Sequence, residues 1–187
     1  MVLKILVLFL PWNLFSSSFP ETAFIICRKA IEHYLLTGEK INFSNLPEIF
    51  NKRIPVYISL RNGNQTRGCA GIFFTDRTFA ENLIDFSIIA ASKDSRYRPV
   101  DINELENIRI QITIPGQIIE IPSISSLNPD KEGLIVEKQG RWGIVLPGEA
   151  KTAQYALKMG LKNAGLINSE GVRLLKFYAQ VFIEGER

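Results

Sequence analysis

The sequence IPVYISLRNGNQTRGCAGIFF, residues 54–74, decides the fold, because it contains two apolar segments separated by a strong turn signal. Asn62-Gly63 within it is the dipeptide most typical of a tight β-hairpin turn. We therefore predict that residues 54–60 and 65–74 form the two antiparallel strands of a hairpin.

The second strand of this hairpin carries the most informative motif of the chain, TRGCAG at residues 66–71. Glycine weakens a strand unless another backbone or a ligand approaches closely, so Gly68 and Gly71 indicate either a chemical site or a tight packing joint. Cys69 is the candidate catalytic nucleophile, because a nearby cation such as Arg67 favours the reactive thiolate. The alternative interpretation is a structural cysteine on a packed strand, and the sequence leaves both open.

The rest of the first half contains clear helix and strand signals. A helix beginning at Pro20 has apolar residues at three- and four-residue spacing and ends at Gly38. Thr78 and Glu81 have the spacing of a capping box, which predicts the start of a second, largely buried helix. Residues 108–114 alternate between isoleucine and polar side chains, a pattern typical of an antiparallel strand with one solvated face.

The second half adds a short strand at residues 118–121 and a second hairpin formed by residues 134–138 and 142–146. A helix over residues 150–164 and a closing strand over residues 173–183 follow. Helices and strands mix without a regular alternation, which is typical of the α+β class. We predict a mixed, largely antiparallel sheet flanked by helices.

The charged segment that follows the second helix is the other candidate binding element. Arginine offers a planar fork to carboxylates and other anions, so Asp94 and Arg96 are candidate binding residues together with Arg67. They would form one site only if the fold brings the segment next to the hairpin. The alternative is an ordinary salt-bridged end of a helix, which contributes little.

Composition excludes several classes of function. The 187 residues are 46% hydrophobic and 22% charged, as in an ordinary globular protein, and a net charge of +3 does not indicate a nucleic-acid partner. The two cysteines, Cys27 and Cys69, do not have the spacing of a metal motif, and no common cofactor-binding motif is present. The one histidine, His33, lies off the apolar face of its helix. We therefore predict no metal site and no cofactor.

The N-terminal residues 1–19 include the apolar run VLKILVLFL, which is too short to span a bilayer as a helix. We interpret residues 1–19 as an apolar arm packed on the domain, with a cleaved signal peptide as the alternative. Residues 20–187 are predicted to form a single domain. The expected location is the cytoplasm, or outside it if residues 1–19 direct export.

In this order, the motifs resemble those of the AMME-syndrome candidate-region protein family, whose prokaryotic members are called AmmeMemoRadiSam system protein A. The family hallmark Leu-Arg-Gly-Cys-Ile-Gly is similar to TRGCAG at residues 66–71, and its Asp-x-Arg-Phe-x-Pro-Leu block is similar to DSRYRPV at residues 94–100. GLIV at residues 133–136 and GIVLP at residues 143–147 match a further block. The resemblance covers residues 20–183.

The resemblance implies an α+β fold with a larger and a smaller lobe, the hallmark lying on the larger one. It also implies association with a Memo-like protein and a radical S-adenosylmethionine enzyme, but no settled reaction. We therefore predict a partner or adaptor domain. The alternative is an enzyme or carrier in a modification pathway that uses Cys69 as nucleophile or acceptor. The chain departs from the family at Thr66 and Ala70, which replace bulky apolar residues, and at Glu132, where many members carry a histidine.

Overall fold

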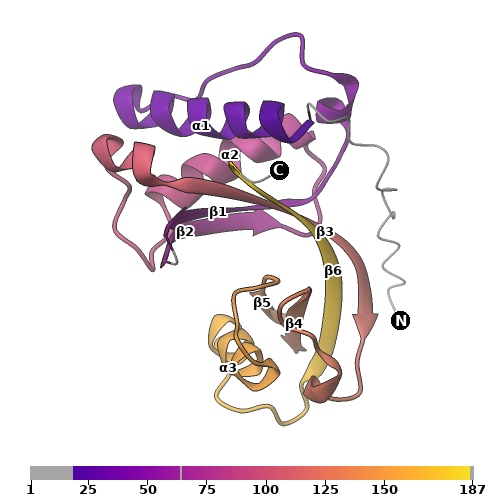
Figure 1. Cartoon of the computed structure of the whole chain (residues 1–187). Helices are drawn as coiled ribbons and strands as arrows, with labels where there is room; N and C mark the ends of the chain where they lie inside the picture. The colour runs from indigo at the N-terminus through magenta and orange to yellow at the C-terminus, as the bar shows by residue number, and fades with distance from the viewer. Residues whose placement is uncertain (1–18, 64, 186–187) are drawn as a thin grey trace. The chain divides into compact units, whose positions relative to one another are not determined.

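The structure, a computed structural model, describes residues 19–63 and 65–185 and has the predicted α+β fold (Figure 1). Residues 1–18, to which most of the predicted N-terminal arm belongs, lie outside this range, while Phe19 begins the first helix and is buried. The helices and strands are α1 (Phe19–Thr37), η2 (Glu48–Asn51), β1 (Val56–Asn62), β2 (Gln65–Ile72), α2 (Phe79–Ser92), η3 (Ile102–Asn107), β3 (Arg109–Glu120), η4 (Ile124–Ser126), β4 (Glu132–Lys138), β5 (Arg141–Val145), α3 (Ala153–Asn163) and β6 (Arg173–Ile183).

The six strands form a sheet in the order β2-β1-β3-β6-β4-β5. The pairings of β1 with β2 and β3, and of β4 with β5 and β6, are antiparallel, as predicted. Two compact units divide the chain: Pro115–Gln180 form one, and the described residues before Pro115 and after Gln180 form the other. That residues 20–187 behave as a single domain stays a prediction. None of the helices in the described part of the chain has both the length and the apolar character needed to cross a membrane.

The predicted hairpin of β1 and β2 is confirmed, but β2 is not a regular strand. Leu60 lies opposite Gly68, whereas Arg61 lies opposite Thr66, so Arg67 is an extra residue on β2. This arrangement is a β-bulge, which bends a strand and redirects the side chains beside it. The alternation of apolar and polar residues in the sequence does not predict the bulge.

Two helices cover one face of this hairpin: α2 packs on β1 and β2, and α1 packs on α2 (Figure 1). The predicted capping box is present, with Thr78 accepting from the Glu81 N–H and Glu81 accepting from the Thr78 N–H. Gly68 allows the close approach of α2, because a Cβ added there would lie 1.9 Å from the Ala90 carbonyl oxygen. Gly68 is therefore a packing joint between β2 and α2.

A cluster of aromatic rings joins the starts of three helical segments. The ring of Phe19 in α1 lies 5.5 Å from that of Phe50 in η2 and 5.6 Å from that of Phe79 in α2, measured between centroids. All three side chains are buried. Such stacked aromatic pairs add to the free energy gained by burying their area. The cluster fixes the position of the α2 N-terminus, and with it the direction in which α2 crosses the sheet.

Strand β3 differs from the prediction in length and in exposure. It merges the expected strands at residues 108–114 and 118–121 into one, because Pro115 lies past the last residue that β1 pairs with, where its missing N–H removes no bond to β1. The prediction of a solvated polar face is wrong for Gln111 and Thr113, which are 3% and 0% exposed. Their polar groups are satisfied instead by Arg61, whose Nη1 donates to Gln111, and by each other.

The unit of residues 115–180 contains the second predicted hairpin and α3. Gln139 and Gly140 form the turn between β4 and β5 with φ of 53° and 79°. The helix packs closely on β5, since a Cβ at Gly143 would lie 1.8 Å from the carbonyl oxygen of Gly160 in α3. Both predicted elements are thus confirmed, and a glycine contact again joins a helix to a strand.

We expect Gly68→Ala to lower the free energy of unfolding by about 3 kcal/mol, because the added methyl group meets a backbone oxygen that cannot move without shifting α2. Gly38→Ala is the matched control: Gly38 has φ of 78° but nothing within 4 Å of an added Cβ. It should cost only about 1 kcal/mol of backbone strain. Urea unfolding of both variants measures the difference, and equal losses would contradict the packing role of Gly68.

Candidate functional site

The structure brings the predicted site residues together around β2. The segment after α2 runs beside this strand, and its Asp94 and Arg96 bind to the backbone of Cys69. Gly68 and Gly71 lie on the same strand and shape its packing. The Arg67 guanidinium donates to Glu104 of η3 and also, at 3.5 Å, to the carbonyl oxygen of Arg98 in the segment after α2.

Asp94 and Arg96 form a bidentate ion pair. Arg96 Nε donates to Asp94 Oδ1 at 2.8 Å, and Arg96 Nη2 donates to Asp94 Oδ2 at 2.7 Å. Asp94 Oδ2 also accepts the backbone N–H of Cys69 at 2.9 Å, while Arg96 Nη2 donates to the Cys69 carbonyl oxygen at 3.3 Å. One side-chain pair therefore satisfies both backbone polar groups of Cys69.

The electrostatics of this pair favour its charged form. The Asp94 side chain is only 7% exposed, and burial alone would raise the pKa of its carboxyl. The hydrogen bonds from Arg96 and from the Cys69 N–H outweigh burial, so the pKa of Asp94 lies below its ordinary value. The same pairing raises the pKa of Arg96. Asp94 is thus an anion bound within the protein at neutral pH.

Arg67 forms a second ion pair, with Glu104 of η3. Its Nη2 donates to Glu104 Oε1 at 2.6 Å, and only 13% of the Arg67 side chain is exposed. Glu104 also accepts the N–H of Asp101 in a capping box, and the bond from Arg67 is the main cause that lowers its pKa. The sequence analysis missed Glu104. The spacing of Asp101 and Glu104 is the signal that could have revealed the capping box, but not the contact with Arg67.

The Cys69 thiol is partly buried and lies beside Ser59 of β1. The Ser59 hydroxyl donates to Cys69 Sγ at 3.3 Å, and Ser59 is itself buried. Tyr57 packs over Gly71, where a Cβ would lie 2.4 Å from the tyrosine ring. Burial raises the pKa of Tyr57, and the Cys69 thiol adds to the shift. Ser59 was also missed, because nothing in the local sequence indicates that its hydroxyl faces the thiol.

The second cysteine plays a different part. Cys27 is fully buried in α1, and burial raises its pKa to about 12, so its thiol stays protonated at neutral pH. Neither Cys27 nor Cys69 is part of a disulfide. His33 lies on α1, which packs mainly on α2. Within residues 19–63 and 65–185, no three His, Cys, Asp or Glu side chains are placed to hold a metal ion.

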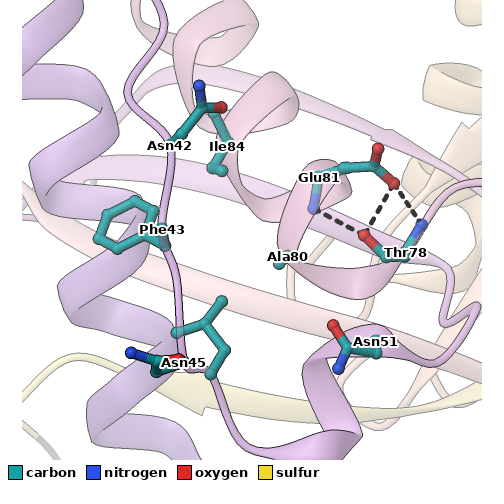
Figure 2. A pocket seen from close by; sticks show the side chains of 9 residues that line it. Asn42, Phe43, Asn45, Asn51, Thr78, Ala80, Glu81 and Ile84 are labelled. Carbon is teal, nitrogen blue, oxygen red and sulfur yellow. Dashed lines mark hydrogen bonds between the residues drawn. The ribbon is translucent and has the colours of Figure 1, made fainter.

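A surface pocket of about 370 Å³ lies elsewhere in the same unit, between the segment before η2 and the start of α2 (Figure 2). Figure 2 shows that Thr78 and Glu81, which line it, bind to each other in the capping box. None of the predicted site residues lines this pocket. Its lining consists of Asn42, Phe43, Asn45, Leu46, Asn51, Thr78, Ala80, Glu81 and Ile84.

Glu132, the departure from the family pattern in the second unit, is a buried structural carboxylate. It accepts the Asn128 N–H at 2.8 Å and pairs with Lys176 at 2.8 Å. Burial would raise its pKa, but these two contacts outweigh it, so the pKa is lowered and that of Lys176 is raised. A paired carboxylate of this kind holds a turn in place.

Comparison with known proteins gives a consistent result over nearly the whole chain. Residues 24–182 match the family model of AMMECR1. A protein from Methanococcoides burtonii is 29% identical, with 91% of this chain and 92% of that protein covered. Protein MJ0810 from Methanocaldococcus jannaschii is 31% identical, covering 85% and 87%. The crystal structure of protein PH0010 from Pyrococcus horikoshii superposes with a TM-score of 0.78 at 26% identity, covering 89% of this chain and 91% of that one.

We expect Asp94→Asn to lower the free energy of unfolding by about 2 kcal/mol at pH 7, because it removes the charge from hydrogen bonds to Arg96 and Cys69. The folded-state pKa of Asp94 lies below the ordinary value of 3.8, so its contribution is present above that value and is lost as the pH falls through the folded-state pKa. The difference between the variant and the original protein should therefore shrink below pH 3.8. Urea unfolding at several pH values measures it, and a difference independent of pH would show that the charge of Asp94 does not stabilise the fold.

Proposed function

Because the chain belongs to the AMMECR1 family, we propose that it is a partner or adaptor domain that presents the Arg67–Cys69 segment of β2 to other proteins. The observation that carries this proposal is the double hydrogen bond of Asp94 and Arg96 to the Cys69 backbone. Charged groups used in this way fix the shape of a surface. A surface whose shape is fixed before binding loses less conformational entropy when a partner docks.

The partners that we propose are a Memo-like protein and a radical S-adenosylmethionine enzyme. The family resemblance of the hallmark supports both. That neither Cys27 nor Cys69 is part of a disulfide is in keeping with a reducing compartment, for which we propose the cytoplasm. Arg96 is paired with Asp94, while Arg98 and Arg67 share the single carboxylate Glu104. This cluster therefore keeps one net positive charge beside β2, which favours an acidic group on the partner.

The test is binding of the tagged chain to the Memo-like protein and the radical enzyme from the same genome, by titration calorimetry. We expect Arg67→Met to weaken binding at least tenfold, because the loss of the guanidinium removes the 2.6 Å bond to Glu104, leaves only the 3.4 Å contact of Arg98 as its ion pair, and loosens the segment beside β2. Arg173→Met is the matched control, since Arg173 also binds glutamates, Glu120 and Glu137, but within the unit of residues 115–180, which does not contain β2. Absence of binding to either protein, or equal loss in both variants, would remove the proposal.

A second candidate function is a modification step in which Cys69 acts as nucleophile or acceptor. The observation that favours it is the Ser59 hydroxyl, which donates to Cys69 Sγ and would stabilise a thiolate there. The glycines beside Cys69 are explained by packing and do not require a ligand. We therefore place this function second.

Alkylation with iodoacetamide at neutral pH separates the two functions. A working nucleophile should label faster than free cysteine, and Ser59→Ala should slow it, because the hydrogen bond that stabilises the thiolate is lost. Buried Cys27 is the internal control and should stay unlabelled. As an adaptor, the Cys69→Ser variant should bind its partners within threefold of the original affinity. Slow labelling with retained binding would exclude the modification step.

A further inference from the structure

Strand β2 is at the end of the sheet, and among the strands that the structure describes it pairs with β1 alone. An edge strand carries a row of backbone N–H and C=O groups that face away from its neighbour. These groups pair readily with a strand of another molecule unless something protects them. Some other part of the protein must therefore protect the edge of β2.

The hydrogen bonds of Cys69 show which groups of β2 face outward. Its N–H and C=O bind Asp94 and Arg96, so they point away from β1. In an antiparallel pair this direction recurs at every second residue, which gives Gly71 the same outward N–H and C=O. Within residues 19–63 and 65–185, Gly71 makes no hydrogen bond to a side chain or a loop. The bulge at Arg67 ends the regular edge on the other side.

The outward edge of β2 from Gly68 to Gly71 is complementary to itself. It consists of Gly68, Cys69, Ala70 and Gly71, all with small side chains or none. If two copies met antiparallel with Ala70 opposite Ala70, Cys69 of each would lie opposite Gly71 of the other. Both residues have outward backbone groups, so the two strands would exchange four hydrogen bonds without placing like charges together.

We propose that Asp94 and Arg96 protect the edge of β2 and keep this strand from pairing with β2 of a second copy of this chain. Asp94 accepts where the carbonyl of a neighbouring strand would accept, and Arg96 donates where its N–H would donate. The pair thus occupies the position of one residue of an added strand. Because the pair already binds the N–H and C=O of Cys69, these two groups cannot bond to Gly71 of a second copy. This inference does not depend on the proposed partner function.

The experiment compares Asp94→Ala and Arg96→Ala with the original chain by sedimentation equilibrium over a wide range of protein concentration. We expect both variants to dimerise at least tenfold more tightly than the original chain. Asp85→Ala is the matched control, because Asp85 is likewise an ion-paired aspartate, bound to Lys40 and Arg77, but lies in α2. It should associate no more tightly than the original chain. The Arg96 variant decides the matter if the Asp94 variant does not fold, since the Arg96 side chain is 52% exposed and can be removed with little loss of packing.

Hydrogen exchange locates the contact. In the variants, amide exchange at Cys69 should be faster than in the original chain at low concentration, and exchange at Cys69 and Gly71 should slow together as the concentration rises. Variants that stay monomeric at every concentration would overturn the proposal. A dimer whose concentration-dependent protection lies outside residues 68–72 would overturn it as well.

Discussion

The contact between β2 and the α2 backbone at Gly68 is the constraint on which the site depends. With no side chain at this position, the Ala90 carbonyl can approach the strand more closely than any other residue would allow. This close approach sets the separation between α2 and the hairpin. Because α2 ends at Ser92, two residues after Ala90, the same contact brings the following segment to the level of the strand. Asp94 can then reach the Cys69 N–H without any long loop.

The two glycines of the hallmark therefore serve opposite faces of one strand. Gly68 makes room for α2, and Gly71 makes room for the Tyr57 ring. Cys69 between them carries its side chain toward Ser59 and its backbone toward Asp94 and Arg96. The bulge bends β2 at Arg67, and the Arg67 guanidinium binds Glu104. The motif is needed in this form because five different contacts meet on a few consecutive residues.

Local sequence patterns predicted the elements well, since hairpin turns, capping boxes and strand alternation are set by neighbouring residues. The hairpin at Asn62-Gly63 and the helix start at Thr78 are examples. The patterns failed where the outcome depends on distant parts of the chain. Alternation gave the two faces of β3 correctly but not the burial of its polar face. Likewise, the contact between Arg67 and Glu104 joins residues far apart in sequence, and only the fold, with its bulge, determines it.

The arrangement of Asp94 also bears on the choice between a binding surface and a reaction centre. A carboxylate that activates a thiol must have an oxygen free to take the proton and a pKa near the working pH. Asp94 uses Oδ2 for the Cys69 N–H and for Arg96, while Oδ1 binds Arg96 Nε, and these bonds lower its pKa. Each contact that improves Asp94 as a support for the strand makes it a weaker base. The carboxylate that binds the Cys69 backbone is thus suited to hold the strand in place, and not to take a proton from the thiol.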